Sequence, residues 1–275
     1  DEALPVTNNF ENTIRKVLKA DRFKIHKLDV EKETINLIVT NTKFRSTAQA
    51  VGRLASTLQR FTSDKIKFAS IHFYSHELQT ASYLVDLEKI TVEQFNPVTP
   101  KGRKPSIKAF DARKPKFTRK NQRLTWGVGP YLTHRLFNPD MPLSVETGIE
   151  VQAGYQLASG LKLSGALRKS VLTNLTKNKR RSNSDLPHVH SDWVLYDLAG
   201  QSGHIHALTL SYKSNLAPGF YGRFHAGLLE PFFAGFGAEV LFKPALWPIG
   251  IGVDIHHVRM RDYNMRFDLL DYETT

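Results

Sequence analysis

Residues 144–157 read SVETGIEVQAGYQL, and apolar and polar side chains alternate along this stretch with a period of two. Val145 and Ile149 fall on one side of an extended chain, whereas Glu146 and Glu150 fall on the other. Successive side chains of a β-strand point to opposite faces of the sheet, so a register shift of one residue would exchange the two faces. The stretch therefore predicts a strand with one apolar face and one charged face.

The alternation recurs from residue 123 to the end of the chain. Predicted strands occupy residues 123–136, 143–158, 160–171, 203–214, 219–229, 232–243, 247–260 and 263–272. Turn sequences such as Ser159-Gly160 separate some strands, while the long polar stretch 173–192 separates others. Short turns at one end and long loops at the other are typical of outer-membrane β-barrels, whose strands need only about 9–11 residues. Residues 121–275 are therefore expected to form an antiparallel β-barrel or part of one.

The composition excludes several classes of protein. The 275 residues contain no cysteine, which excludes disulfides, thiolate catalysis and cysteine-ligated metals. No run of about 18 apolar residues is present, as a membrane-spanning helix would need. Much of the net charge of +12 comes from residues 101–120 and 177–181, which indicates a linker and a loop rather than a nucleic-acid surface. The first residues lack the pattern of a signal peptide, so the chain is expected to be mature, clipped or cut from something larger.

The first part of the chain has mixed periodicity. Helical spacing over residues 8–20 and 46–61 predicts two amphipathic helices. Strand candidates are residues 22–30, 34–41, 66–75 and 78–85. We therefore expect residues 1–95 to form an α+β module. Residues 96–120 combine prolines with many cations and are interpreted as a basic linker, with docking on lipid phosphate or on another barrel as the alternative.

The polar positions of the predicted barrel supply the candidate contacts with a polysaccharide or with the barrel lumen. They are Glu146, Glu150, Gln152, Arg168, Arg223, Glu239, Asp254, Arg259 and Arg261. Two carboxylates about 5–10 Å apart can hydrolyse a glycosidic bond. A simpler expectation is that these acids pair with Lys162, Arg168, Arg223 or Lys243 inside a barrel. Since no nucleophile elbow, phosphate loop or dinucleotide fingerprint is present, a non-enzymatic protein without a cofactor is expected.

Histidine pairs suggest metal binding, but the spacing does not complete a site. The pairs are His188 with His190, His204 with His206, and His256 with His257. His204 and His206 would share one face of a strand, whereas adjacent His256 and His257 would point to opposite faces. No spacing defines a third ligand. These side chains are therefore interpreted as polar lumen or loop residues, and no metal site is assigned.

Four blocks of sequence resemble a known family. They are Phe44–Arg53 (FRSTAQAVGR), Tyr221–Glu230 (YGRFHAGLLE), Phe233–Pro244 (FAGFGAEVLFKP) and Asn264–Thr275. They are similar to the YjbH family of bacterial outer-membrane lipoproteins associated with exopolysaccharide production. The resemblance implies a larger protein with two β-barrel regions, periplasmic α/β modules and neighbouring secretion components. This chain has no lipobox cysteine and no second barrel, and it ends in mid-pattern, so it is expected to be a C-terminal portion.

Together, the pattern and the resemblance predict a protein of the bacterial outer membrane with its N-terminal module in the periplasm. Its expected role is to assist export or surface assembly of an exopolysaccharide. The expected partners are outer-membrane lipid, the exopolysaccharide, other secretion components and further barrel strands of the full-length protein, but no nucleic acid. Two alternatives remain: a carbohydrate-active enzyme that uses Glu146, Glu150, Glu239 and Asp254, and a soluble β-sandwich that binds polysaccharide.

Overall fold

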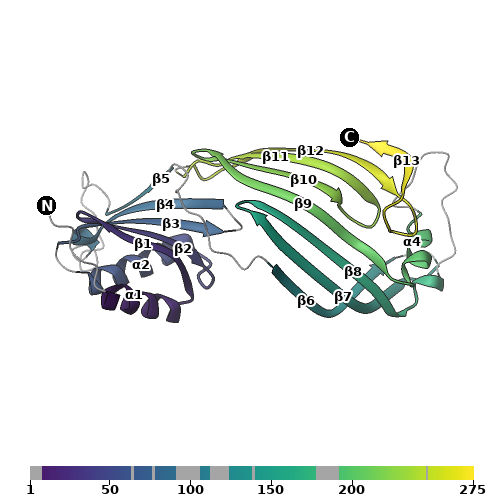
Figure 1. The fold of residues 1–275 in the computed structure, drawn as a ribbon, viewed down its shortest axis with the longest axis horizontal. Coiled ribbons are helices and arrows are strands. Elements are labelled where there is room, and N and C mark those ends of the chain that lie inside the picture. Colours follow the sequence, from purple (N-terminus) through teal and green to yellow (C-terminus); the bar gives the residue numbers. More distant parts are fainter. Residues whose placement is uncertain are drawn as a thin grey trace. The chain divides into compact units, whose positions relative to one another are not determined.

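The fold was analysed in a computed structural model that describes residues 8–62, 65–75, 78–90, 106–111, 124–137, 140–177, 192–245 and 247–275. The chain divides into two compact units (Figure 1). One unit comprises residues 1–119 with segments 215–221 and 241–251. The other comprises residues 120–214, 222–240 and 252–275. Each unit contains a sheet of its own, and the fold is β-rich as predicted.

The first sheet has five strands in the order β1-β2-β3-β4-β5. The strands are β1 (Phe23–Glu31), β2 (Thr34–Asn41), β3 (Phe68–Ser75), β4 (Leu78–Asp86) and β5 (Ile107–Phe110). β2 and β3 are parallel, and the other neighbouring strands are antiparallel. A parallel pair needs a crossover connection, and helix α2 (Thr47–Phe61) lies between these two strands in the chain. The earlier helix α1 spans Asn8–Ala20.

The two helices cover one face of this sheet through an apolar core. Leu18 of α1 and Leu54 of α2 are fully buried together with Leu37 and Ile71 of the sheet. At the start of α2, the Ser46 side chain accepts a hydrogen bond from the backbone N–H of Gln49, as an N-cap residue does. Both helices lie at the positions that the helical spacing predicted.

The first sheet includes a strand from the segment that was interpreted as a linker. β5 lies within residues 96–120 and pairs with β4, where Ile107 is opposite Val85. Ile107 also packs against the buried apolar core of the sheet. Its apolar contact explains why this short segment adds to the sheet although its neighbours in sequence are rich in proline and basic residues.

The second sheet has eight strands that follow one another in chain order, from β6 at one edge to β13 at the other. They are β6 (Leu124–Leu136), β7 (Leu143–Ala158), β8 (Leu161–Thr173), β9 (His204–Ala217), β10 (Phe220–Leu228), β11 (Phe233–Phe242), β12 (Ile251–Arg261) and β13 (Leu269–Thr274). The described strands form one open layer, in which β6 and β13 are not neighbours. The β-sandwich alternative requires two facing sheets with a shared core, and this single layer gives it no support.

The connections of the second sheet have unequal lengths. β7 and β8 are separated only by residues 159–160, and β9 and β10 by residues 218–219. By contrast, residues 174–203 separate β8 from β9 and include a 3₁₀ turn, η1 (Leu175–Lys177), and helix α4 (Trp193–Gly200). The predicted contrast between short turns and a long connection is therefore present. The helix within that connection was not predicted.

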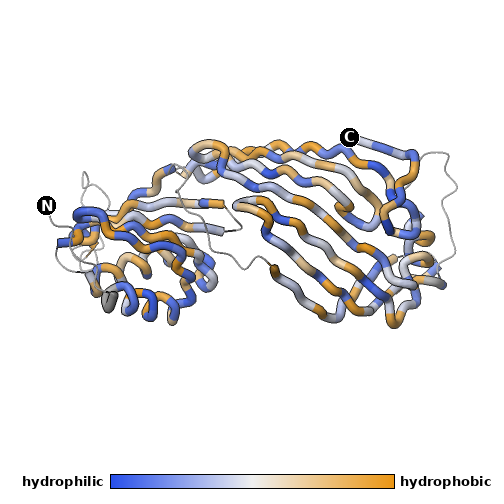
Figure 2. The backbone as a smooth tube through the Cα atoms, in the orientation of Figure 1, coloured by the Kyte–Doolittle hydropathy of each residue, from blue (hydrophilic) through white to orange (hydrophobic). Residues whose placement is uncertain are grey.

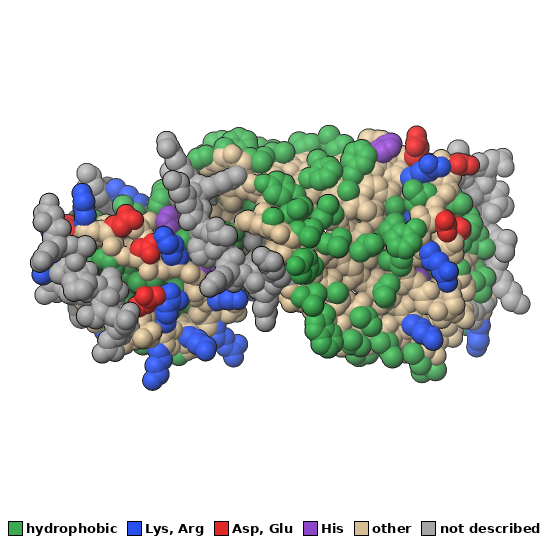
Figure 3. All heavy atoms as spheres, in the orientation of Figure 1, with side chains coloured by type: hydrophobic (Ala, Val, Ile, Leu, Met, Phe, Trp, Pro, Cys, Tyr) green, Lys and Arg blue, Asp and Glu red, His purple; other side chains and the backbone are tan. Residues whose placement is uncertain are grey.

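The apolar face of the second sheet is the more exposed one. On β7, Ile149 is 51% exposed and Leu157 is 50% exposed, whereas Ser144 on the opposite face is fully buried. On β12, Val253 is 63% exposed. Figure 2 shows apolar and polar residues alternating along these strands, and Figure 3 shows hydrophobic side chains gathered over the visible face of this sheet. This distribution is the reverse of that expected where water surrounds a sheet.

The described part of the chain contains no helix with the length and apolar character needed to cross a membrane.

The first sheet contains a half-buried histidine that makes its stability sensitive to pH. Burial lowers the pKa of His72, whose Nδ1 lies 2.9 Å from Ser82 Oγ and whose Nε2 lies 3.1 Å from Ser70 Oγ. Below the ordinary pKa of 6.5, the unfolded chain binds a proton that the folded chain does not bind. The contribution of neutral His72 to the stability of the folded state is therefore complete above pH 6.5. It decreases as the pH falls from that value toward the lowered pKa of His72 in the folded state.

We expect amide exchange in β3 to become faster, beyond the intrinsic effect of pH, when the pH is lowered from about 7.5 to about 5.5. His72→Gln should reduce this dependence, whereas His257→Gln, on β12, should leave it unchanged. Hydrogen exchange followed by mass spectrometry measures both effects. Equal pH dependence in the wild type and in His72→Gln would contradict the prediction.

Candidate functional site

The polar face of the eight-stranded sheet carries a charged cluster on β6, β7 and β8. Arg168 is opposite Glu150 in the strand register, and its Nε lies 2.6 Å from Glu150 Oε2. The Arg168 guanidinium also lies over the Tyr131 ring, 4.7 Å from its centroid. The Tyr131 hydroxyl donates a 2.6 Å hydrogen bond to Glu146. The structure thus brings together three predicted site residues, and Glu150 pairs with Arg168 as expected.

A second charged cluster lies on β10, β11 and β12. Arg223 Nε is 2.9 Å from Glu239 Oε2, and Arg223 Nη2 is 3.9 Å from Asp254 Oδ2. Glu239 therefore pairs with a predicted cation, and Asp254 lies beside the same guanidinium. Near this cluster, the Nε2 atoms of His225 and His256 are 3.2 Å apart. Sequence spacing did not reveal this contact, because the two histidines lie on strands separated by β11.

The two remaining predicted arginines have different environments. Arg259 is exposed, and its Nη2 lies 3.1 Å from Asp271 Oδ1. Arg261 is fully buried and donates hydrogen bonds to backbone carbonyls, including those of Glu230 and Met265. The Arg261 guanidinium is therefore engaged by the protein itself, whereas Arg259 lies where a ligand can reach it.

Helix α4 is held by polar contacts from two distant strands of the sheet. Arg135 of β6 forms a bidentate ion pair with Asp197, and its guanidinium lies 4.4 Å from the Trp193 ring centroid. The buried Tyr196 hydroxyl donates a 2.6 Å hydrogen bond to the carbonyl of Arg261. Burial raises the pKa of Asp197, and the hydrogen bond and charge of Arg135 oppose that rise. The sequence signal for this helix is the apolar run that begins at Trp193, which adjoins a long polar stretch.

The contacts of α4 border a small cavity of about 110 Å³. Its lining includes Glu146, Arg168, Asp197, His204 and His206. The rings of His204 and His206 have centroids 6.1 Å apart. Residues 188 and 190 lie outside the described residues. Across the part of the chain that the structure describes, no group of three or more histidine, aspartate or glutamate side chains is arranged to hold a metal ion.

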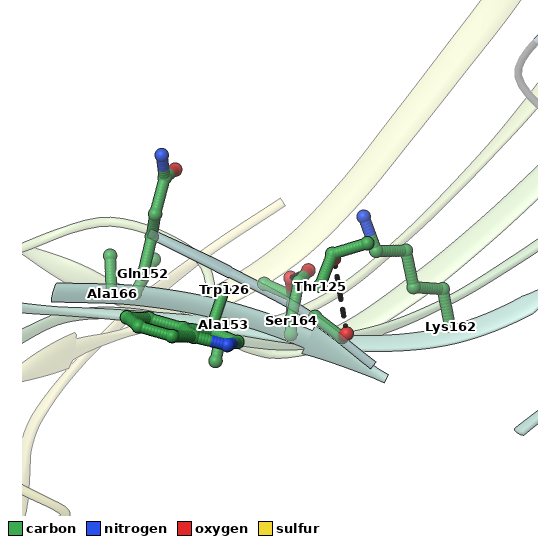
Figure 4. A pocket seen from close by; sticks show the side chains of 11 residues that line it. Thr125, Trp126, Gln152, Ala153, Lys162, Ser164 and Ala166 are labelled. Atoms are coloured by element: carbon green, nitrogen blue, oxygen red, sulfur yellow. Dashed lines mark hydrogen bonds between the residues drawn. The ribbon is translucent and has the colours of Figure 1, made fainter. Parts of the chain in front are cut away.

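A shallow hollow of about 380 Å³ opens on β6, β7, β8 and β9. Its polar lining residues are Thr125, Gln152, Lys162, Ser164 and Thr209. In Figure 4, the side chains of Gln152 and Lys162 rise from one side of the strands, while Trp126 and Ala153 lie on the other side. Gln152 is the predicted site residue in this hollow. Lys162 was expected to pair with one of the acids, but the ion pairs of the described acids on this face are made by Arg168 and Arg223. Thr125, Ser164 and Thr209 were not selected from the sequence, because only the strand register brings them together.

The site offers hydroxyl, amide and charged groups on one face of a sheet whose other face is apolar and exposed. The fold and this site define a β-rich protein with an amphipathic, meandering sheet of eight strands. The family model of YjbH, described as "Exopolysaccharide biosynthesis protein YbjH", matches residues 5–275. The chain belongs to the YjbH family.

A curated relative is similar to part of the chain. It is the "Uncharacterized lipoprotein YjbH" of Escherichia coli (strain K12), with 26% identity over 156 residues. The match covers 54% of this chain and 22% of the relative, so it spans less than a quarter of that protein's length. No solved structure matches the chain.

Proposed function

We propose that this chain contributes an outer-membrane β-barrel region to a non-enzymatic protein that assists export or surface assembly of an exopolysaccharide. In this proposal, residues 124–275 contribute barrel strands, and the five-stranded sheet lies in the periplasm. The membership of the YjbH family supports the connection with exopolysaccharide. The distribution of apolar side chains supports the membrane location.

The observation that carries the membrane proposal is the exposed apolar face of the second sheet. Trp126 and Leu132 on β6 are 73% and 68% exposed, and Ile255 on β12 is 60% exposed. Apolar surface in water costs roughly 25 cal/mol per Å², so a face of this extent requires an apolar environment. Outer-membrane barrels place such residues against lipid and place polar residues inside. The paired charges on the opposite face fit a polar barrel interior.

The open edges of the sheet support the proposed need for further strands. β6 and β13 each have one strand neighbour among the described elements. In lipid, unpaired backbone N–H and C=O groups cost several kcal/mol each, since no water can bond to them. Further strands of the full-length protein would pair these edges and close the barrel. Other secretion components remain proposed partners of the assembled protein.

The proposed contacts with the polymer lie on the polar face. The predicted residues on this face are Glu146, Glu150, Gln152, Arg168, Arg223, Glu239 and Asp254. Arg259 lies instead two residues after His257, whose ring contacts Phe236 of the apolar face, so it belongs to the apolar side of β12. Most of these charges are already paired, as Glu150 is with Arg168 and Glu239 is with Arg223. Paired carboxylates and arginines favour a binding surface over general acid–base chemistry, which needs a carboxyl group free to exchange a proton.

Membrane location is tested first by fractionation of the intact protein. We expect it in the outer-membrane fraction, with extraction only by detergent and with migration on gels that changes on heating. A urea-washed membrane fraction and a soluble periplasmic marker serve as controls. Recovery as a soluble, detergent-free monomer would overturn the proposal.

The orientation of the apolar face is tested with single-tryptophan proteins. Among the three tryptophans of the chain, Trp126 lies on the apolar face and Trp193 lies on α4 against Arg135. In vesicles that contain brominated lipids, we expect strong quenching of Trp126 fluorescence in a Trp193→Phe, Trp247→Phe protein. The matched protein that retains only Trp193 should be quenched much less. Equal quenching of the two proteins would contradict the proposed orientation.

The biological role is tested separately in a deletion strain. We expect less secreted exopolysaccharide in the absence of the protein and recovery when the intact gene is returned. Intracellular polymer is measured alongside, because a defect in export leaves synthesis intact. Unchanged secretion in the deletion strain would remove the proposed role.

A further inference from the structure

We infer that the hollow on β6, β7, β8 and β9 is a subsite for an acidic sugar residue of the exported polymer, with Lys162 as the group that recognises its carboxylate. This inference rests on the proposed function and deepens it by naming the chemical class of the polymer. It concerns a position on the polar face rather than the membrane location of the sheet.

The hollow exists because small residues meet across four strands. Gly154 is opposite Thr125 on β6 and Ser164 on β8, and Ser164 is opposite Thr209 on β9. In the adjacent row, Ala166 is opposite Gln152 on one side and Ala207 on the other. Larger side chains at these positions would fill the volume of about 380 Å³. The space is comparable to that of the small-molecule sites found in proteins, which begin at about 300 Å³.

Lys162 is an uncommitted cation in this hollow. The arginines of the same sheet are engaged by acids, as Arg168 is by Glu150 and Arg223 is by Glu239. Lys162 is exposed and forms no ion pair with the described carboxylates. Its side chain passes over Gly154, where an added Cβ would lie 2.6 Å from Lys162 Cε. The glycine therefore leaves room for the lysine stem beside the hydroxyl of Thr125.

The groups in the hollow fit a sugar that carries a negative charge. Ser164 Oγ and Thr209 Oγ1 are 3.2 Å apart, so two neighbouring hydroxyl groups line the same hollow as Lys162. None of the lining residues is acidic, and Gln152 adds an amide that can donate and accept hydrogen bonds. Hydroxyl and amide groups suit sugar hydroxyls, and the ammonium suits a carboxylate. The net charge of +12 would also draw a polyanion toward the protein.

The test compares binding of two sugar polymers to the intact, detergent-solubilised protein. We expect polygalacturonate to bind and neutral dextran to bind at least about tenfold more weakly, as for loss of one charge-assisted hydrogen bond. Lys162→Gln should weaken polygalacturonate binding by about the same factor and leave dextran unaffected. Lys169→Gln is the matched control, because Lys169 lies on the same strand opposite Ile149 of the apolar face. Equal binding by Lys162→Gln and the wild type would overturn the inference.

Two further binding measurements distinguish recognition of the sugar hydroxyls from recognition of the negative charge. Polyglutamate should bind more weakly than polygalacturonate, because it lacks the hydroxyls that Ser164 and Thr209 would contact. Ala166→Met should fill the hollow without changing the charge and should weaken binding of polygalacturonate. Equal binding of the two polyanions would overturn the assignment of a sugar site. A protein that fractionates with the outer membrane but binds dextran and polygalacturonate equally would retain the proposed function and lose this inference.

Discussion

Replacing Arg261 by alanine is expected to lower the free energy of unfolding by at least about 3 kcal/mol. The buried guanidinium donates to the carbonyls of Glu230, Ile205, Met265 and Arg266 at distances of 2.6–3.0 Å. Alanine would leave these acceptors without the donor and would open a space at the end of β12. Each buried acceptor that is left without its charged donor lowers the free energy of unfolding by about 1–3 kcal/mol, before the structure relaxes around it. Urea unfolding in detergent measures the difference.

Arg259→Ala is the matched control for this experiment. Arg259 lies two residues earlier on β12, and it is exposed where it pairs with Asp271. Exposed ion pairs of this kind contribute about 0–1 kcal/mol. Arg261→Lys keeps the charge but cannot reach all four carbonyls, so its stability should lie between those of the wild type and Arg261→Ala. Equal destabilisation by the alanine variants at 259 and 261 would show that the buried carbonyl cluster has no special role.

The second large effect is expected for Gly148→Ala on β7. A Cβ added at Gly148 would lie 2.1 Å from the carbonyl oxygen of Lys169 and 2.7 Å from Cε1 of Tyr131. The Lys169 oxygen belongs to the backbone of β8 and can move only if the strand moves. We expect a loss of about 1–3 kcal/mol or more in unfolding free energy. The Tyr131 ring would also be displaced from its hydrogen bond to Glu146.

Gly129→Ala is the control, because a Cβ at Gly129 on β6 would meet no atom within 4 Å. It should change stability by less than about 0.5 kcal/mol. Urea unfolding gives the energies, and the fluorescence of the protein at equilibrium reports whether the native state is retained. Tyr131→Ala alone serves as the reference for the double variant Gly148→Ala, Tyr131→Ala, because removal of the buried ring has its own cost. Gly148→Ala should still reduce stability in that background, since the contact with the β8 carbonyl remains, and no further loss would contradict the role assigned to that carbonyl.

The strands of the second sheet could largely be predicted because their signal is local. The predicted strand 143–158 coincides with β7, and 160–171 lies within two residues of β8. The last predicted strand, 263–272, was placed too early, since β13 begins at Leu269. Residues 262–268 form a loop in which the carbonyls of Met265 and Arg266 accept hydrogen bonds from the Arg261 guanidinium. These hydrogen bonds from one buried side chain hold the loop, and they leave no periodic pattern in the sequence.

The candidate site could be predicted only in part. Pairing of the acids with Lys162, Arg168, Arg223 or Lys243 was expected, because residues of opposite charge lay on the same predicted face, and the structure pairs Glu150 with Arg168 and Glu239 with Arg223. The contact between His225 and His256 was missed, as was the ion pair of Arg135 with Asp197 on α4. Each of these joins elements that are far apart in the chain. Their meeting depends on the order of the strands and on the path of the long connection.

By itself, the sequence determined that this protein contains amphipathic strands and which side chains share a face. That information is local, because neighbouring residues of a strand point to opposite sides whatever the rest of the chain does. Only the tertiary structure decided which residues of different strands meet. Register places Glu150 beside Arg168, leaves Lys162 in a hollow of small side chains and buries Arg261 among carbonyls. Hydrogen bonding and packing between strands decide register, and they act between residues distant in the chain.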